Sequence, residues 1–153
     1  MNGEESGLRL VEAGPGEESY RLQDQIGFVL RKAHQRHVAI FASHIGDLTP
    51  PQFAALAKLL AIGPTSQNHL GSLIAMDAAT VKGVIDRLKA RGLVVITRDG
   101  GDKRRLLVSL TEAGRAAVEG LIPRAQEITA QTLQPLTPRE AGTLLRLLGR
   151  ISE

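Results

Sequence analysis

The chain contains no cysteine, which excludes disulfide bridges, thiolate metal sites and any sensing mechanism based on cysteine oxidation. It also lacks a run of about 18 apolar residues that could cross a bilayer, although hydrophobic residues make up 42% of its composition. The N-terminal residues have neither the basic start nor the apolar segment of a secretory signal. These absences predict a cytoplasmic protein without membrane association.

Sequence motifs of enzymes are absent as well. The chain has no glycine-rich phosphate loop, no serine or cysteine nucleophile motif and no zinc-hydrolase helix signature. Its carboxylates are scattered, so their spacing does not indicate a general acid/base pair. We therefore expect no catalysis and no cofactor.

Positive charge is concentrated in residues 82–105. This segment holds eight basic and three acidic residues, whereas the whole chain has a net charge of only +3. A basic segment in an otherwise slightly acidic chain is typical of proteins that dock on a polyanion such as DNA. From charge alone, a solvated surface is the alternative interpretation.

Apolar periodicity and helix-start signals predict a mostly helical chain. Residues 1–19 are rich in Gly, Glu and Ser and are expected to form a mobile arm, to which we assign no function. The predicted helices cover residues 20–43, 50–62, 67–75, 78–90 and 112–134, the last with a bend or restart near Pro123, and a terminal helix begins at Pro138. Their starts are marked by capping boxes at Thr49 with Gln52 and Thr137 with Glu140, and by single caps at Asp77 and Thr111.

Two apolar, β-branched runs, 93–97 and 106–110, flank a polar loop with two glycines and predict a β-hairpin. The expected fold is therefore mainly α with a small β-hairpin, in the order of a winged helix-turn-helix with helical extensions at both ends. Residues 46–111 would form the DNA-binding lobe. Helix 78–90 would then be the recognition helix, which enters the major groove.

The periodicity of helix 78–90 supports this assignment. Val81, Val84, Ile85 and Leu88 form an inward stripe, while Ala79, Gly83, Asp86 and Ala90 face outward between Lys82 and Arg87. Small residues at 79 and 83 would let the backbone approach DNA closely, and Thr80, Lys82 and Arg87 could reach phosphates or base edges. Exposed Ala and Gly are common, so this feature alone is modest evidence.

The hairpin tip adds Arg98, Lys103 and Arg104 beside a turn that could fit a narrow minor groove. Asp99 and Asp102 would oppose DNA if they faced it. We therefore expect at least Asp102 to pair with a wing arginine or a neighbouring arginine and to fix its direction. A solvent-exposed hairpin with incidental charges is the alternative.

The chain resembles the MarR family of bacterial regulators over roughly residues 20–152. The segments that carry the resemblance are residues 80–94, Arg98-Asp99, Asp102-Lys103-Arg104 and residues 108–114. The Asp-x-x-Asp-x-Arg wing followed by Leu-Thr-x-x-Gly is its most specific part. The resemblance implies a homodimer held by residues 20–45 and 112–153, which binds a pseudo-palindromic double-stranded DNA operator and releases it on meeting a small, often aromatic ligand. Residues 95–97 depart from the family because they are more apolar than the charged stretch common there.

The effector is harder to predict. His37 and His44 project onto the apolar stripe of the first helix, where a structural histidine in an interhelical or dimer contact is the first interpretation. Ligand binding is the second, because segment 30–37 resembles the helix of MarR-type regulators of aromatic acid catabolism in which an arginine and a histidine six positions later contact a carboxylate-bearing ligand. In this chain, the resemblance assigns those roles to Arg31 and His37.

Two further alternatives remain open. His34, His37, His44 and His69 could supply nitrogen ligands to a sensed metal, although the chain shows no compact ligand motif and we predict no metal site. The wing could instead bind protein in a helical protein-interaction module. Salt dependence would distinguish the two uses of the wing, because phosphate-driven DNA binding weakens steeply with salt.

Overall fold

The computed structural model describes residues 19–153, so the arm predicted over residues 1–19 lies outside the described residues apart from Ser19. The chain divides into two compact units, residues 1–35 and 36–153. Between Ser19 and Glu153, no helix is both long and apolar enough to cross a membrane.

The first unit contains a short 3-10 helix, η1 (Leu22–Asp24), and the beginning of α1 (Ile26–His44). The prediction of one continuous helix from Tyr20 is wrong, because Gln25 adopts an extended backbone with φ −87° and ψ 134°. The Gln25 side-chain amide donates a hydrogen bond to the Arg21 carbonyl at 3.1 Å. The helix therefore begins at Ile26, and the unit exposes several large apolar side chains: Tyr20, Leu22, Ile26, Val29 and Leu30.

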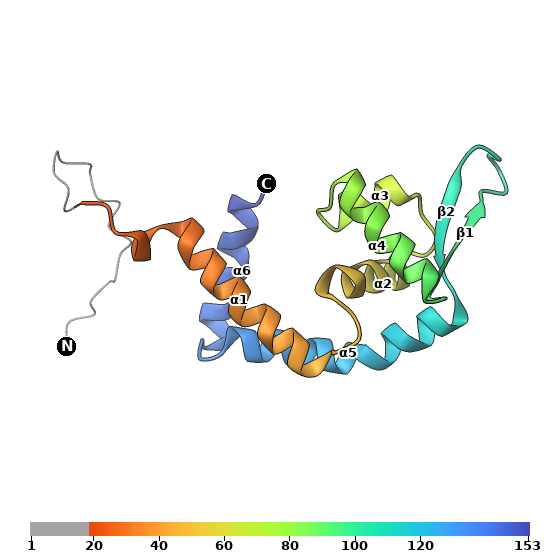
Figure 1. Cartoon of the computed structure of the whole chain (residues 1–153). Coiled ribbons are helices and arrows are strands. Elements are labelled where there is room, and N and C mark those ends of the chain that lie inside the picture. The colour runs from red at the N-terminus through yellow and green to blue at the C-terminus, as the bar shows by residue number, and fades with distance from the viewer. Residues whose placement is uncertain (1–18) are drawn as a thin grey trace. The chain divides into compact units, whose positions relative to one another are not determined.

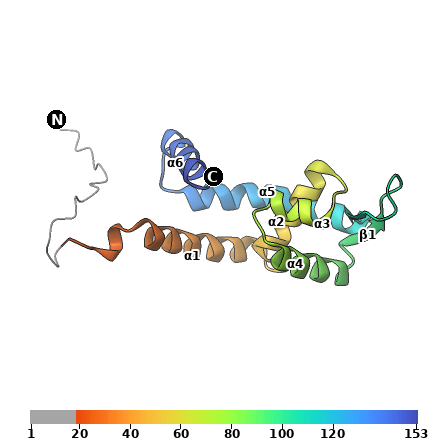
Figure 2. The same ribbon diagram turned by 90° about the horizontal axis from the view of Figure 1, so that it is seen from above.

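The second unit contains the rest of α1 and all the remaining elements (Figure 1). In chain order these are α2 (Pro50–Ile62), α3 (Gln67–Leu73), α4 (Ala78–Ala90), β1 (Val94–Arg98), β2 (Leu106–Leu110), α5 (Glu112–Leu133) and α6 (Pro138–Ile151). The helices and the antiparallel hairpin confirm the predicted fold class. Helix α5 starts at the base of the hairpin, and α6 lies at its other end (Figures 1 and 2).

The predicted helix starts are confirmed. In α2 the Thr49 hydroxyl accepts from the Gln52 N–H while the Gln52 carboxamide accepts from the Thr49 N–H, and Thr137 and Glu140 form the same reciprocal box at α6. Asp77 caps α4 and Thr111 caps α5 through their side chains. Each cap pairs an N–H group that the first turn of a helix leaves without a partner.

The helix ends were harder to predict. Gly92, with φ 74°, ends α4 as predicted, and the Leu93 N–H bonds back to the Leu88 carbonyl at 3.0 Å. Helix α3 ends at Leu73, two residues earlier than expected, because Ala75 adopts φ 57° and the Met76 N–H returns to the Gly71 carbonyl. A left-handed alanine costs about 1 kcal/mol and carries no glycine signal.

Helix α5 runs through Pro123 without the restart considered from the sequence. Pro123 is exposed, so the carbonyl that loses its helical donor can be hydrated. The continuous helix spans 22 residues, or about 33 Å at 1.5 Å per residue.

Helix α2 lies at the centre of the core, where it packs against α3, α4, α5 and β2. Phe53 of α2 meets Phe41 of α1 edge to face, with ring centroids 6.2 Å apart. The buried apolar residues are Ile40, Phe41, Ile45, Leu48, Ala55, Leu56, Leu59, Leu70, Val81, Val84, Ile85, Leu88, Val94, Val108, Val118 and Ile128. None of them belongs to α6.

Candidate DNA-binding interface

Helices α3 and α4 form the helix-turn-helix. Asp77 caps α4 by accepting a hydrogen bond from the Thr80 N–H at 2.7 Å. This bond, with a second from the Thr80 hydroxyl, lowers the pKa of Asp77. The four residues predicted to face inward, Val81, Val84, Ile85 and Leu88, are buried. Helix α4 thus presents the predicted face to solvent.

The outward face of α4 carries small and basic side chains. Lys82 Nζ lies 2.6 Å from Asp86 Oδ2, an exposed pair of the kind that contributes little to stability. Arg87 is exposed, and no carboxylate within residues 19–153 forms an ion pair with it. A Cβ added at Gly83 would lie 3.9 Å from Nη1 of Arg87, so the guanidinium extends along α4 beside Gly83.

The tip of the wing is held by its own polar groups. Asp99 Oδ1 accepts from the Gly101 N–H and Asp102 Oδ1 from the Arg104 N–H, each at 3.0 Å. The Asp99 N–H donates to the Arg105 carbonyl at 2.8 Å and closes the loop. Both aspartates therefore bond to backbone groups two residues ahead, as short acidic side chains do in turns.

These contacts correct the sequence interpretation of the wing. The predicted pairing of Asp102 with an arginine guanidinium is wrong, because its partner is the backbone N–H of Arg104. Arg98 donates from Nη1 to the Lys103 carbonyl at 2.8 Å and braces the tip, and its contact with DNA stays a prediction. Lys103, Arg104 and Arg105 are exposed cations. The sequence reasoning omitted Arg105, although its position beside Arg104 was available.

The wing is fixed at its base by the segment that joins β2 to α5. The Thr111 hydroxyl donates to the Gly92 carbonyl at 2.6 Å and accepts from the Gly114 N–H at 3.0 Å. A Cβ on Gly114 would lie 1.9 Å from the Leu93 carbonyl oxygen, so only glycine fits. Leu-Thr-x-x-Gly therefore locks the end of α4, the hairpin and the start of α5 together.

The histidines of α1 that lie in the second unit have partners on α5. His37 Nδ1 is 2.9 Å from Thr132 Oγ1, and His44 Nε2 is 2.8 Å from Gln131 Oε1. His44 Nδ1 also lies 3.5 Å from a carboxylate oxygen of Glu127. These contacts support a structural role in an interhelical contact and leave ligand binding by His37 a prediction.

Arg36 strengthens the same contact between helices. Its guanidinium donates to the carbonyls of Gln131, Thr132 and Gln134 at the C-terminus of α5. A cation there pairs the carbonyls left without helical donors and opposes the helix dipole favourably. No sequence pattern predicts this contact, because its partners are backbone atoms about one hundred positions away.

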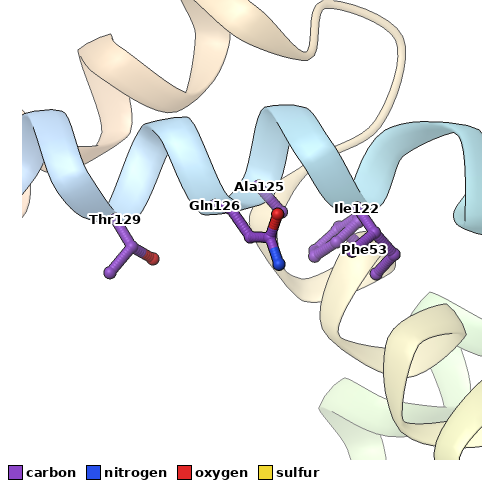
Figure 3. Close-up of a pocket in the computed structure, with 5 residues that line it drawn as sticks. All are labelled: Phe53, Ile122, Ala125, Gln126 and Thr129. Carbon is purple, nitrogen blue, oxygen red and sulfur yellow. The ribbon is translucent and has the colours of Figure 1, made fainter.

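A largely open surface cavity of about 340 Å³ lies between α2 and α5 (Figure 3). Its lining is Phe53, Ile122, Ala125, Gln126 and Thr129, and the two polar side chains come from successive turns of α5. An apolar wall with a few polar groups is typical of sites for small organic molecules. The sequence reasoning missed this cavity, because no local pattern distinguishes these residues from other partly buried or exposed helix positions.

The remaining predicted site residues are not brought together. Arg31 is exposed on α1 within the first unit, so its ligand role remains a prediction. His34 and His69 are also exposed. In the described part of the chain, no group of three or more His, Asp or Glu side chains could hold a metal ion.

Comparison with known proteins agrees with this geometry. The MarR family model matches residues 46–105, which include α2, the helix-turn-helix and most of the wing. The HTH-type transcriptional repressor NicR of Pseudomonas putida is 42% identical over 134 residues, covering 86% of this chain and 85% of NicR. The chain belongs to the MarR family.

Solved structures extend the similarity well beyond the segment that the family model matches. A probable transcriptional regulator from Pseudomonas aeruginosa is 55% identical with a TM-score of 0.83, covering 86% of this chain and 99% of that protein. BpsR of Bordetella bronchiseptica, whose DNA binding is regulated by 6-hydroxynicotinic acid, is 43% identical with a TM-score of 0.84, covering 88% and 97%. Membership of the family confirms the resemblance described from the sequence.

Proposed function

We propose that this protein is a homodimeric transcriptional repressor that binds a pseudo-palindromic operator and releases it on binding an aromatic carboxylate. The observation that carries the proposal is the exposed cationic surface formed by α4 and the wing. Lys82, Arg87, Lys103 and Arg104 are exposed there, while the wing aspartates turn into their own loop. Similarity to NicR, a repressor, and to BpsR supports this use of the surface.

Two copies are required because the apolar face of α6 is not buried within one chain. Its apolar stripe remains exposed at Leu144, Leu145, Leu147 and Ile151. An apolar surface of this kind marks a protein interface. We assign residues 20–45 and 112–153 to dimerisation and residues 46–111 to DNA binding. A twofold dimer then reads half-sites about one helical turn, or roughly 10 bp, apart.

The effector site we propose is the cavity between α2 and α5. The Phe53 ring can pack against a planar aromatic ligand, and Gln126 and Thr129 can hydrogen-bond its ring substituents. Independently of this cavity, the family resemblance assigns contacts with the ligand carboxylate to Arg31 and His37. His37 Nδ1 bonds to Thr132, and its Nε2 is the atom we assign to the carboxylate. Hydroxylated benzoic and nicotinic acids carry both the ring and the carboxylate that these assignments require.

The experiment begins with selection of duplexes from fragmented genomic DNA, followed by sequencing of the bound fragments. The enriched duplex is then titrated with protein in the presence of hydroxybenzoates, cinnamates, their thioesters and 6-hydroxynicotinic acid. One pseudo-palindrome released by one compound is the expected result, and Arg31→Ala and His37→Ala should lose that release while keeping DNA affinity.

The other outcomes separate the parts of the proposal. Specific binding that no aromatic compound relieves would refute the effector assignment and keep the regulator. Failure to enrich any duplex would replace DNA binding by the protein-interaction alternative. In that case complex formation should respond weakly to salt, whereas DNA binding should fall with a log-log slope of about −0.9 per phosphate contacted.

A further inference from the structure

The linker between α1 and α2, residues 45–49, is held from two sides by arginines. Arg124 of α5 donates from Nη1 to the His44 carbonyl at 3.1 Å, where α1 ends. Arg91, directly after α4, donates from Nη1 to the Asp47 carbonyl, and its Nη2 lies 3.7 Å from Asp47 Oδ2. The linker is therefore the point at which polar contacts join α1, α4 and α5.

The two carbonyls that accept these bonds lack backbone donors. Residues 45–49 form no helix or strand, and in the described part of the chain no backbone N–H donates to the His44 or the Asp47 carbonyl. Carbonyls of this kind take side chains or water as partners. A guanidinium suits the task because its donors form a rigid fork, which here reaches a carbonyl and a carboxylate of the same residue.

The linker is itself fixed by burial. Ile45 is 1% exposed and Leu48 is 6% exposed, so both side chains belong to the core. The capping box of Thr49 and Gln52 follows immediately and fixes the start of α2. A group that bonds to the Asp47 carbonyl is therefore tied to the core, although the Asp47 side chain is exposed.

The two ends of α4 are held in different ways. Near the N-terminal end, Val81 packs closely on α3, since a Cβ added at Gly71 would lie 3.0 Å from Cγ1 of Val81. Near the C-terminal end, Leu88 is the last buried residue of the helix, and residues 89–92 are exposed. The guanidinium contact with the linker therefore holds the end of α4 where packing no longer does.

We propose that Arg91 is a positioning residue for DNA recognition: by anchoring the end of α4 to the linker, it fixes the angle at which α4 enters the major groove. The inference rests on the proposed function and concerns the orientation of α4, not a contact of Arg91 with DNA. The helix has 13 residues and is about 20 Å long, so a small change of angle moves the side chains at one end away from the base edges. An exposed ion pair alone contributes little, so the anchor depends on the bond to the Asp47 carbonyl.

The test is a pair of substitutions, Arg91→Ala and Asp47→Lys. Arg91→Ala removes the anchor and should weaken affinity for the duplex enriched by the wild-type dimer about fivefold. Asp47→Lys adds a positive charge, and general attraction to DNA would then tighten binding. If Arg91 positions α4, Asp47→Lys should instead weaken binding, because the new ammonium repels the guanidinium from the Asp47 carbonyl. The two explanations therefore predict opposite signs.

Two further measurements separate positioning from a phosphate contact. The slope of log affinity against log salt should be unchanged in Arg91→Ala, whereas loss of a phosphate contact would make it less steep by about one for each chain. Hydrogen exchange of the Leu93 N–H, which bonds to the Leu88 carbonyl at the end of α4, should become severalfold faster in both variants. Exchange of the Val81 N–H, near the start of α4, should stay the same.

Lys89→Ala is the matched control. It removes one positive charge from the same turn of α4, and the Lys89 side chain forms no ion pair within residues 19–153. Its effect should come from charge alone, with exchange of the Leu93 N–H unchanged. Arg91→Lys keeps the charge and a donor on a flexible stem, so it should recover part of the affinity lost in Arg91→Ala. Thermal unfolding of each variant would show whether the fold is retained.

Each outcome decides one question. Tighter binding by Asp47→Lys, or a less steep salt slope in Arg91→Ala, would make Arg91 a direct DNA contact and overturn the inference. Faster exchange at the end of α4 with unchanged duplex affinity would show an anchor without influence on recognition, which also overturns it. If the wild-type dimer bound no duplex, the proposed function would fail, and the exchange measurement would still decide whether Arg91 anchors α4.

Discussion

Helices α2 and α6 begin with the same local design and end in opposite environments. Both start with threonine followed by proline, and both close a reciprocal capping box, Thr49 with Gln52 and Thr137 with Glu140. Helix α2 buries Gln52, Ala55, Leu56 and Leu59, whereas α6 buries no residue. The local sequence therefore determines where a helix begins, and the surface opposite that helix determines what it buries.

The difference separates two kinds of stability. Helix α2 packs against four other elements of the same chain, so Ala55, Leu56 and Leu59 are buried within one copy. Helix α6 has a well-separated apolar stripe whose Leu145 is 54% exposed. Its stability must depend on protein concentration, because its apolar face can be buried only against another surface.

The largest predicted effect is that of Leu56→Ala in α2. Leu56 is fully buried, so its truncation leaves a cavity and should lower the free energy of unfolding by about 2–5 kcal/mol. Urea unfolding followed by circular dichroism would measure this loss. Leu73→Ala is the matched control, because Leu73 is 41% exposed and should lose far less. Equal losses in the two variants would contradict the assigned core.

The next effect is expected from Leu145→Glu, which places a charge on the apolar stripe of α6. The dimer should dissociate in sedimentation experiments, and operator affinity should fall about a hundredfold because one chain reaches only one half-site. Thr143→Glu adds the same charge to an exposed position on the polar side of the same helix and should leave the dimer intact. A dimer that survives Leu145→Glu would remove α6 from the interface.

Much of the fold could be predicted because its signals are local. Caps, capping boxes and the 3.6-residue periodicity act within one or two turns, and they placed the starts of α2, α4, α5 and α6 correctly. The errors arose where the signal was missing. Ala75 ends α3 without a glycine, and the extended backbone of Gln25 interrupts the first helix although its composition suits a helix.

The candidate site divides in the same way. The basic outward face of α4 follows from periodicity, so Lys82 and Arg87 could be named from the sequence. Three other features depend on loop geometry or on distant elements and could not be predicted: the bracing role of Arg98, the backbone partner of Asp102 and the burial of Gln52. The cavity between α2 and α5 joins residues about seventy positions apart, and no single-sequence pattern indicates that contact.

A smaller effect is expected from removing the two threonine caps. Thr49→Ala and Thr137→Ala should each cost about 1 kcal/mol, because each leaves an N–H of the first helical turn without its acceptor. Thr49→Ala should lower the urea midpoint of the lobe at any protein concentration. Thr137→Ala should instead raise the dissociation constant of the dimer, about fivefold. The same response from both variants would show that the two regions unfold as one.

The smallest effect distinguishes the two capping boxes by pH. Hydrogen bonds from the Thr137 backbone N–H and side chain lower the pKa of Glu140 below its ordinary value of 4.5. A carboxylate with a lowered folded pKa contributes stability above its unfolded pKa, and that contribution disappears as pH falls through the folded pKa. Dimerisation should therefore weaken slightly on acidification below about pH 4.5, and Glu140→Gln should remove this part of the response.

In α2 the neutral Gln52 already occupies the position equivalent to Glu140. Acid sensitivity of the lobe should therefore come from Asp77, whose pKa is also lowered, and not from the capping box of α2. If sedimentation showed identical acid responses for wild type and Glu140→Gln, the α6 cap would not contribute to the interface, and helix α6 would owe its place in the dimer to its leucines alone.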